Sequence, residues 1–249
     1  MPLLHDYAII NDDTLKKPAF IEHGQLQQFD IVLANPPYSI SQWDRSAFEN
    51  DKYGRNFLGT PSQGIADFAF LQHILKSMDP VSGRCAVLLP RGILSRYSEI
   101  EMRRNLVQSD LVECVVGVGK GLFYNSPMEA CVMICRMQKP YDRCNKVLII
   151  NASKLIYKEG TQSFLSTDDI SRISDVYHNY VEEPNFSRVV SNEDILKNNA
   201  SLSITLYIPQ LGDISEDVDC VESVQDWISA SANMNKEFDK LISMLGVKI

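Results

Sequence analysis

The sequence contains a run of four residues that could hold and orient a small polar group, Asn35-Pro36-Pro37-Tyr38. The two prolines fix successive backbone angles and donate no amide hydrogens, and Asn35 is pushed to an extended conformation by the proline that follows it. The Asn35 side-chain oxygen and the Pro36 carbonyl are therefore two acceptors that can converge on one point. Tyr38 adds a flat ring on which a planar group can stack.

A substrate amino group carries two hydrogens that suit such a pair of acceptors. Both hydrogen bonds draw electron density toward the nitrogen and orient its lone pair, as an amine needs to attack a methyl sulfonium in line. The alternative is that these residues form only a stiff loop. A binding role is favoured because they directly follow Asp30–Ala34, an apolar run that predicts a strand buried on both faces. Ligands of open parallel sheets bind beyond the carboxyl ends of the strands.

The elements that position this stretch alternate between strands and helices. Apolar runs predict strands at Tyr7–Ile10, Asp30–Ala34, Cys85–Pro90, Leu111–Val118, Glu129–Arg136 and Lys146–Ile150. Helices are predicted over Ala66–Asp79 and, from a capping box at Ser98–Glu101, through about Gln108. This order indicates an α/β fold with a mostly parallel, doubly wound sheet. The late strands, joined by a loop and no helix, predict an antiparallel pair at one edge.

The pattern changes after Ile150. Residues 151–210 carry a helical face that includes Ile173 and Tyr180, and a second capping box at Ser191 with Asp194 three residues later. Residues 211–249 predict a C-terminal amphipathic helix that packs on the body of the protein or on a partner.

The bulk composition narrows the class of protein. The 249 residues are 45% apolar, enough for one domain with extensions. A net charge of −8 without a basic cluster argues against a free-standing nucleic-acid binder. No apolar run could span a bilayer and no signal peptide is evident, which indicates a cytoplasmic protein. The cysteine pattern predicts reduced thiols and disfavours a zinc or other metal site. The cysteines are Cys85, Cys114, Cys131, Cys135, Cys144 and Cys220.

The stretch FDIVLANPPYS resembles motif IV of amino-group methyltransferases. The segments ADFAFLQHIL, GRCAVLLPRGIL, RRNLVQSDLVECVVGV and LFYNSPMEACVMICR resemble the modification (M) subunit of type I restriction–modification systems, and so do FSRVVSNEDILKNN and LSITLYIP. That family methylates adenine N6 in DNA with S-adenosylmethionine. The resemblance implies a partial, Rossmann-like methyltransferase domain at 1–150, a post-catalytic segment at 151–210 and a helical extension at 211–249.

The resemblance also implies catalytic roles for the motif. Asn35 and the Pro36 carbonyl would hold the adenine amino group, and Tyr38 would stack on an adenine flipped out of the duplex. Pro37 belongs to the same catalytic motif. Phe123 or Tyr124 is implied as a second aromatic wall of the substrate site, with a core aromatic as the alternative.

The cofactor residues are implied in the same way. Asp13 matches the residue of the family that contacts the adenine moiety of S-adenosylmethionine, with an exposed turn residue as the alternative. Asp67 and Phe68 fall where motif V lines the cofactor pocket, although helix capping and core packing explain them about as well.

Three features of the family are missing from the sequence. The Gly-rich turn and the ribose-binding acidic residue that precede the first strand in the family are lacking, and so is its N-terminal helical domain. The clustered glycines Gly117, Gly119 and Gly121 match no cofactor motif. We therefore expect the C-terminal portion of an M subunit, weak or no S-adenosylmethionine binding by the isolated chain, and no activity alone. An exposed apolar sheet edge would favour self-association or a partner.

The implied partners are DNA, the specificity and restriction subunits of a type I complex, and a second M subunit, with no membrane. Two other functions remain open. One is a protein-glutamine or RNA amino methyltransferase, whose families share the four-residue motif. The other is a non-catalytic remnant that binds a specificity subunit through Val221–Leu245.

Overall fold

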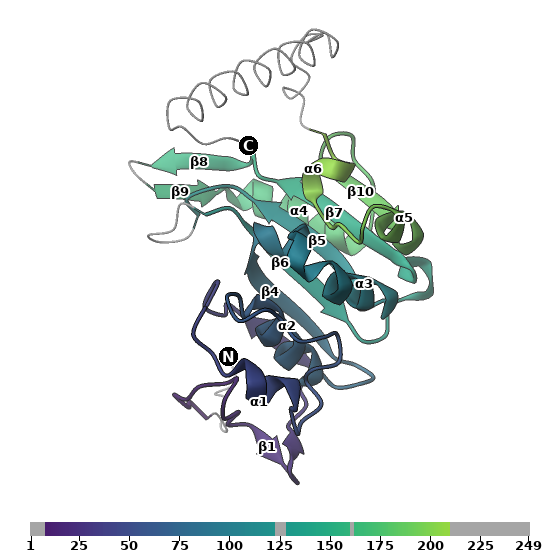
Figure 1. Cartoon of the computed structure of the whole chain (residues 1–249). Coiled ribbons are helices and arrows are strands. Elements are labelled where there is room, and N and C mark those ends of the chain that lie inside the picture. The colour runs from purple at the N-terminus through teal and green to yellow at the C-terminus, as the bar shows by residue number, and fades with distance from the viewer. Residues whose placement is uncertain (1–7, 123–127, 160–161, 210–249) are drawn as a thin grey trace, which may run out of the picture. The chain divides into compact units, whose positions relative to one another are not determined.

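The computed structural model describes residues 8–122, 128–159 and 162–209 (Figure 1). The chain up to Pro209 forms one compact unit around a six-stranded sheet of order β10-β7-β5-β6-β4-β3. Its strands are β3 Ile31–Ala34, β4 Arg84–Pro90, β5 Val112–Val118, β6 Ala130–Arg136, β7 Lys146–Ala152 and β10 Ser187–Ser191. Two hairpins lie outside it: β1 (Ile21–Glu22) with β2 (Gln25–Leu26), and β8 (Ile156–Glu159) with β9 (Gln162–Leu165). The predicted helix over 211–249 lies outside the described residues.

Strand direction confirms the predicted α/β fold. β3, β4, β5 and β7 run in one direction, while β6 and β10 run in the other. The late strands β5 and β6 pair antiparallel as expected, but β6 lies between β5 and β4 and not at an edge. The antiparallel pair at the edge is formed by β7 and β10. β10 was not predicted, because its five residues end at Ser191, the cap of the next helix, and show no clear alternation.

The helices α2 to α5 lie close to the predicted positions, whereas α1 and α6 were not predicted. The helices are α1 Arg45–Glu49, α2 Asp67–Lys76, α3 Ile100–Gln108, α4 Thr167–Asn179, α5 Asn192–Lys197 and α6 Ile204–Tyr207, with 3-10 turns η1 Arg91–Leu94, η2 Tyr97–Glu99 and η3 Tyr141–Arg143. The Ser191 side chain caps α5 as predicted. The capping box at Ser98 is wrong, because Ser98 lies inside η2 and α3 begins after Glu99 without a side-chain cap.

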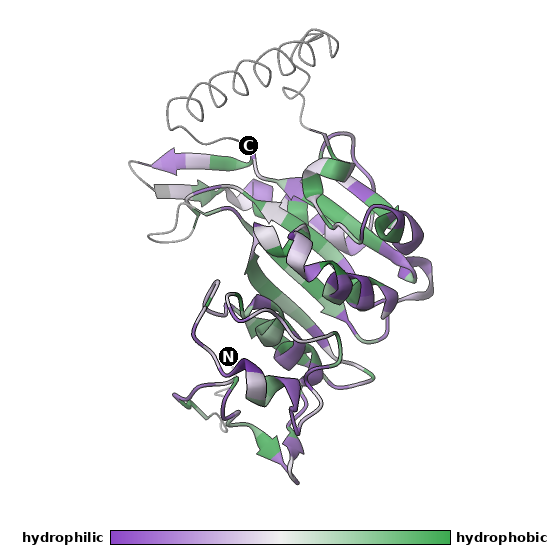
Figure 2. Ribbon diagram, in the orientation of Figure 1, coloured by the Kyte–Doolittle hydropathy of each residue, from purple (hydrophilic) through white to green (hydrophobic). Residues whose placement is uncertain are grey.

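Helices cover the two faces of the sheet unequally. Side chains of α2, α3, α5 and α6 pack on one face, with Phe68, Leu106 and Ile204 among the buried residues. On the other face the apolar cluster joins β5 and β7 to α4 through Val176. Hydrophobic residues accordingly follow the strands, while hydrophilic residues occur on the outer sides of the helices (Figure 2).

The edge strand β3 departs from the sequence expectation. We predicted burial on both faces, but Ile31 is 54% exposed and Leu33 is 77% exposed. Val32 and Ala34, which point the other way, pack on the α2 side of the sheet. No described strand pairs with the outer edge of β3. The expected exposed apolar edge is therefore present. Two residues of the apolar run, Ile31 and Leu33, lie on a face of β3 that the described part of the chain leaves exposed.

The predicted strand at Tyr7–Ile10 is wrong over its described part. Residues 8–10 have no regular structure, and Ile9 is 89% exposed. An isolated apolar run forms a strand only when another strand supplies hydrogen-bonding partners, and none of the described strands lies beside this one.

The glycine at position 117 explains how the C-terminal helices approach the sheet. Gly117 lies in β5 between β6 and β7, paired with Cys131 and Asn151. A Cβ atom at this position would collide with Cδ1 of Ile204 in α6. The glycine therefore serves close packing, consistent with the absence of a cofactor motif around it.

Replacing Gly117 by Ala should destabilise the protein by about 1–3 kcal/mol, because the added methyl group overpacks this contact. Ile204→Val removes the colliding atom and alone should cost about 0.5–1.5 kcal/mol. The double variant should lose less stability than the sum of the two single changes. Urea unfolding of the four proteins measures the coupling, and strictly additive losses would contradict the packing described here.

Candidate functional site

The Asn35-Pro36-Pro37-Tyr38 turn begins directly where β3 ends. Ala34, the last residue of β3, pairs with Val87 of β4, so Asn35 leaves the carboxyl end of a parallel pair. The Asn35 side chain is close enough to Tyr38 for a hydrogen bond, in which the Tyr38 hydroxyl donates to Asn35 Oδ1 at 3.1 Å. Partial burial raises the pKa of Tyr38, so its hydroxyl stays protonated and remains a donor near neutral pH.

The residue after the turn is fixed by a distant carboxylate. Ser39 has a φ of 52°, in the left-handed region that residues other than glycine seldom adopt. Its amide donates to Asp67 Oδ1 at 2.8 Å. Asp67 is the first residue of α2, yet its side chain does not cap that helix. Its carboxylate joins α2 to the turn.

An arginine from the loop after β4 holds the same carboxylate. Arg96 Nη1 donates to Asp67 Oδ2 at 2.7 Å, and the Asp67 side chain is only 1% exposed. Arg96 also contacts Glu99 at 3.2 Å. Burial of Glu99 raises the pKa of its carboxyl to about 7, and the Arg96 charge only partly offsets this effect. Of the two carboxylates, Asp67 is the closer partner of Arg96, at 2.7 Å against 3.2 Å for Glu99.

A pocket of about 410 Å³ opens beside the turn. Asn35, Pro36 and Pro37 line one part of it. The rest of its wall comes from β3, from the inner side of α2 and from the segment that precedes β1. These residues are Ile10, Asp12, Thr14, Pro18, Ala19, Phe20, Phe29, Val32, Ala34, Phe70, His73, Ile74 and Ser77. The wall is mostly apolar with a few polar groups, as is usual for small-molecule sites.

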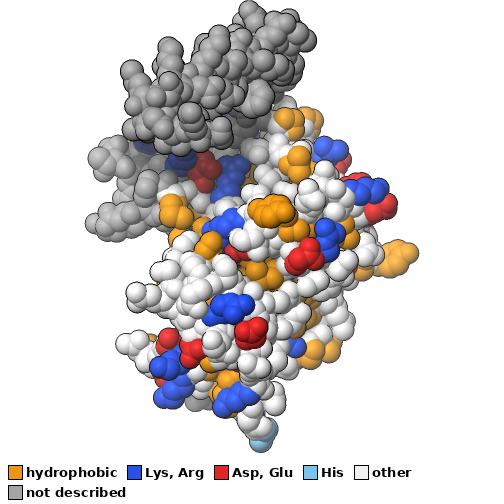
Figure 3. Space-filling view, viewed as in Figure 1, with side chains coloured by type: hydrophobic (Ala, Val, Ile, Leu, Met, Phe, Trp, Pro, Cys, Tyr) orange, Lys and Arg blue, Asp and Glu red, His pale blue; other side chains and the backbone are white. Residues whose placement is uncertain are grey.

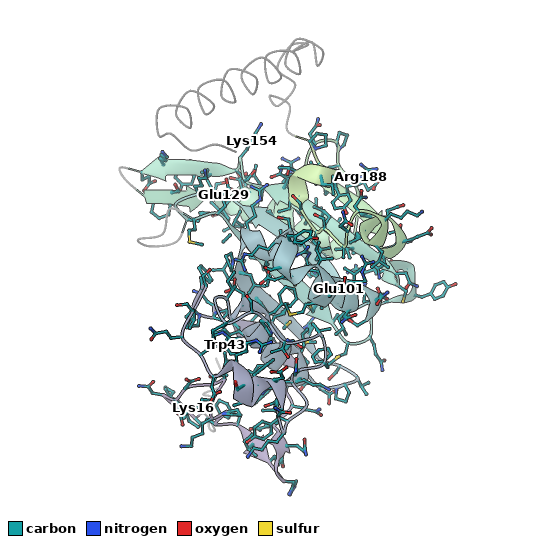
Figure 4. All side chains as sticks on the ribbon, viewed as in Figure 1. Lys16, Trp43, Glu101, Glu129, Lys154 and Arg188 are labelled. Carbon is teal, nitrogen blue, oxygen red and sulfur yellow. The ribbon has the colours of Figure 1, made fainter. Side chains whose placement is uncertain are left out.

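A buried ion pair contacts the N-terminal segment that lines this pocket. Arg55 is paired with Asp51 at 2.7 Å, and both side chains are almost fully buried. The Arg55 guanidinium also donates to the carbonyls of Thr14 and Leu15, at 3.1 and 2.8 Å. Arg55 therefore holds the N-terminal segment against the loop that contains α1. Lys16 and Trp43, from these two segments, lie at the same end of the unit (Figure 4).

His73 is the titratable group of α2 that lines the pocket. Burial lowers the pKa of His73 to about 4, and the nearby Arg55 charge lowers it further than the Asp51 charge raises it. Arg55 Nη1 lies 3.5 Å from His73 Nδ1. Because a guanidinium only donates, Nδ1 is the acceptor of this contact, and His73 is a neutral imidazole at neutral pH.

Asp13 and Phe68, which were predicted to lie near the cofactor, are not among the residues that line the pocket. Asp13 is exposed, and its Oδ1 accepts from the amides of Leu15 and Lys16 within its own turn. Its neighbour Asp12 lines the pocket. Phe68 is fully buried in the core, whereas Phe70 of the same helix reaches the pocket. The assignments of Asp13 and Phe68 stay predictions, and Phe123 and Tyr124 lie outside the described residues.

Sequence reasoning missed several pocket residues. Phe20, Phe70 and His73 line the pocket together with the turn. The helical spacing of α2 could have placed Phe70 and His73, three residues apart, on one helix face. Nothing in the sequence around Phe20 shows that this segment folds back onto β3.

Other types of site find little support. No group of three or more metal-binding side chains occurs among the residues described by the structure. Within the same ranges, no helix is long and apolar enough to cross a membrane. The cysteines of β4, β5 and β6 (Cys85, Cys114, Cys131 and Cys135) are buried free thiols, and burial raises the pKa of Cys131 to about 12, which makes this thiol a poor nucleophile.

Comparison with known proteins identifies the family. The model of the N-6 DNA Methylase family matches residues 3–216. The chain belongs to this family. It is 28% identical to the HindI methylase subunit of Haemophilus influenzae, over 97% of this chain and 56% of that protein. It is 32% identical to the MjaVIII methylase subunit of Methanocaldococcus jannaschii, over 90% of this chain and 40% of that protein.

Solved structures agree with these relatives. The methyltransferase subunit of a type I restriction–modification system from Streptococcus thermophilus superposes with a TM-score of 0.73 and 29% identity, over 80% of this chain and 42% of that chain. The EcoKI M protein shares the fold, with a TM-score of 0.54 and 19% identity. The resemblance to type I M subunits is thereby confirmed. This N-6 DNA methylase chain spans roughly half the length of the relatives that it matches.

The neutral state of His73 has a consequence for stability. Between pH 6.5 and about 4 the unfolded chain binds a proton at His73 that the folded chain does not. The contribution of His73 to the free energy of unfolding should therefore fall by about 3 kcal/mol as pH drops through this range, at about 1.4 kcal/mol per pH unit.

The His73→Gln variant should lose this dependence, which urea unfolding at a series of pH values measures. Glu99, with its raised pKa, contributes stability at low pH that is lost as pH rises toward 7, so the comparison is made between variants. His23→Gln is the matched control, because the His23 side chain is 93% exposed. An unchanged slope in His73→Gln would show that the buried histidine is not the group that titrates.

Proposed function

We propose that this chain supplies the target-amine site of a site-specific N6-adenine DNA methyltransferase, the modification subunit of a type I restriction–modification system. The observation that carries this proposal is the Asn35–Tyr38 turn at the end of β3, beside a mostly apolar pocket, in a chain of the N-6 DNA methylase family. Asn35 and Pro36, which would accept the hydrogens of the amine, also line the pocket that would hold the methyl donor, and so does Pro37.

In this proposal the turn binds the amino group of an adenine flipped out of the duplex. Asn35 Oδ1 and the Pro36 carbonyl accept its two hydrogens, and the Tyr38 ring stacks on the base. Tyr38 now donates to Asn35 Oδ1. When the base enters, its amino group replaces the Tyr38 hydroxyl as the donor, and the ring becomes free to stack. With S-adenosylmethionine bound, the oriented N6 lone pair would form a bond to the methyl carbon as the methyl–sulfur bond breaks, the bond's electron pair would stay on the departing thioether sulfur, and the surplus N6 proton would pass to solvent.

S-Adenosylmethionine fits the pocket in size and character. A volume of about 410 Å³ lies within the range of small-molecule sites, roughly 300–1,000 Å³. Phe20, Phe70 and Pro37 offer apolar walls for its adenine ring, and Asp12 and His73 offer polar partners at the rim and on α2. When bound, the cofactor supplies the activated methyl group.

Charge supports the view that other subunits supply most of the affinity for DNA. The net charge is −8, and basic and acidic side chains are interspersed on the face shown in Figure 3. Arg91 and Arg96, in the loop after β4, are each paired with a carboxylate. We therefore propose a cytoplasmic complex with specificity and restriction subunits and a second M subunit. The exposed outer side of β3 gives self-association or a partner a place to pack.

In the complete methyltransferase assembly, Asn35→Ala should lower the rate of methyl transfer to DNA adenine by about 100–1,000-fold, since one preorganised partner of the reacting amine is lost. Tyr38→Phe should retain most of the activity, whereas Tyr38→Ala should not, because stacking needs only the ring. Transfer of tritiated methyl groups to DNA measures these rates. Full activity of Asn35→Ala would contradict the assigned role.

The isolated chain should bind S-adenosylmethionine weakly or not at all and should not methylate DNA, because it lacks the Gly-rich turn and ribose-binding acid of the family. Calorimetric titration of the folded chain measures this binding. Saturable binding that Phe70→Ala abolishes would mean that the pocket alone suffices for the cofactor, and the expected dependence on further residues would be wrong.

A further inference from the structure

The contact that connects the Asn35–Tyr38 turn to the rest of the fold is made by Asp67. Its Oδ1 accepts the Ser39 amide and its Oδ2 accepts Arg96. We propose that Asp67, held by Arg96, is the positioning residue that fixes the Asn-Pro-Pro-Tyr turn for methyl transfer. This inference rests on the proposed function of the turn and assigns a role to two residues outside it.

The backbone at Ser39 needs such a contact. A left-handed conformation in a residue with a Cβ persists only where the surroundings hold it, and such strain concentrates at functional sites. Ser39 adopts this conformation immediately after Tyr38, with φ at 52°. The hydrogen bond to Asp67 is the described contact of its amide. Release of that amide would let the chain relax and would move Tyr38 relative to Asn35.

The other end of the contact is rigid. The Arg103 side chain is almost fully buried in α3. It donates to the carbonyl of Arg96 at 2.8 Å and to the carbonyl of Ala200 at 3.0 Å. The loop after β4 is therefore fixed from two sides, and the Arg96 guanidinium points at a carboxylate that cannot move far. Asp67 therefore connects the turn to a rigid part of the core.

Only a carboxylate satisfies both donors. Ser39 and Arg96 each present N–H groups to opposite oxygens of Asp67. An asparagine has one acceptor oxygen, so its NH2 group would face either the Ser39 amide or the Arg96 guanidinium, donor against donor. Asp67→Asn therefore keeps the shape of the side chain and removes one of the two contacts.

The first test is amide hydrogen exchange of the full chain, followed by NMR at Ser39. In Asp67→Asn the Ser39 amide should exchange at least ~10-fold faster than in the parent protein, because it loses either its acceptor or, where the asparagine oxygen faces Ser39, the negative charge and the Arg96 contact that hold this acceptor in place. Asp51→Asn is the matched control. Asp51 is an equally buried carboxylate paired with an arginine at the same distance of 2.7 Å, but it does not contact the turn. Asp51→Asn should destabilise the protein. Exchange at Ser39 should change by no more than this loss of global stability accounts for.

The second test is the rate of methyl transfer in the complete assembly. Asp67→Asn should lower kcat by about 100-fold with little change in the KM for S-adenosylmethionine, the loss expected for a small misplacement of a reacting group. Unchanged exchange at Ser39 would overturn the proposal and leave Asp67–Arg96 as an ordinary ion pair. Faster exchange with normal kcat would overturn it too. If no assembly transfers methyl groups to DNA, the proposed function fails, while the exchange result still decides whether Asp67 fixes the turn.

Discussion

The buried Asp67 carboxylate is the interaction on which the geometry of the site depends. It is nearly inaccessible to solvent, and it accepts hydrogen bonds from a strained residue after the turn and from a fixed arginine. A buried carboxylate is costly unless it is fully paired, and here both oxygens have donors. Removing either partner would leave a buried charge with an unmet contact, so the three segments that meet at Asp67 are constrained together.

A second constraint acts on the pocket beside the turn. Arg55 and Asp51 form a buried pair that holds the N-terminal segment by its carbonyls. The same guanidinium lowers the pKa of His73, which keeps that side chain neutral on the wall of the pocket. Two arginine–carboxylate pairs, one for the turn and one for the pocket wall, thus position elements that lack regular secondary structure.

The edge strand β3 has one packed face and one exposed face. Its inner residues pack against α2 and line the pocket, while Ile31 and Leu33 are exposed on its other face. A parallel strand of a doubly wound sheet is ordinarily covered on both faces. The exposed apolar surface therefore lies directly behind the proposed amine site, and whatever packs there would also stiffen the strand from which Asn35 emerges.

The sequence by itself determined the strand that ends in Asn35, the helix that carries Asp67, most of the sheet and the family. These depend on local patterns of apolar spacing and on a motif whose prolines restrict their own backbone. Only the tertiary structure decided that β6 lies between β4 and β5, that β3 is exposed on one face, and that Asp67 bonds to Ser39 instead of capping its helix. Each of these depends on groups far apart in the chain, such as Ser39 and Arg96, which have no reason in the sequence to meet at one carboxylate.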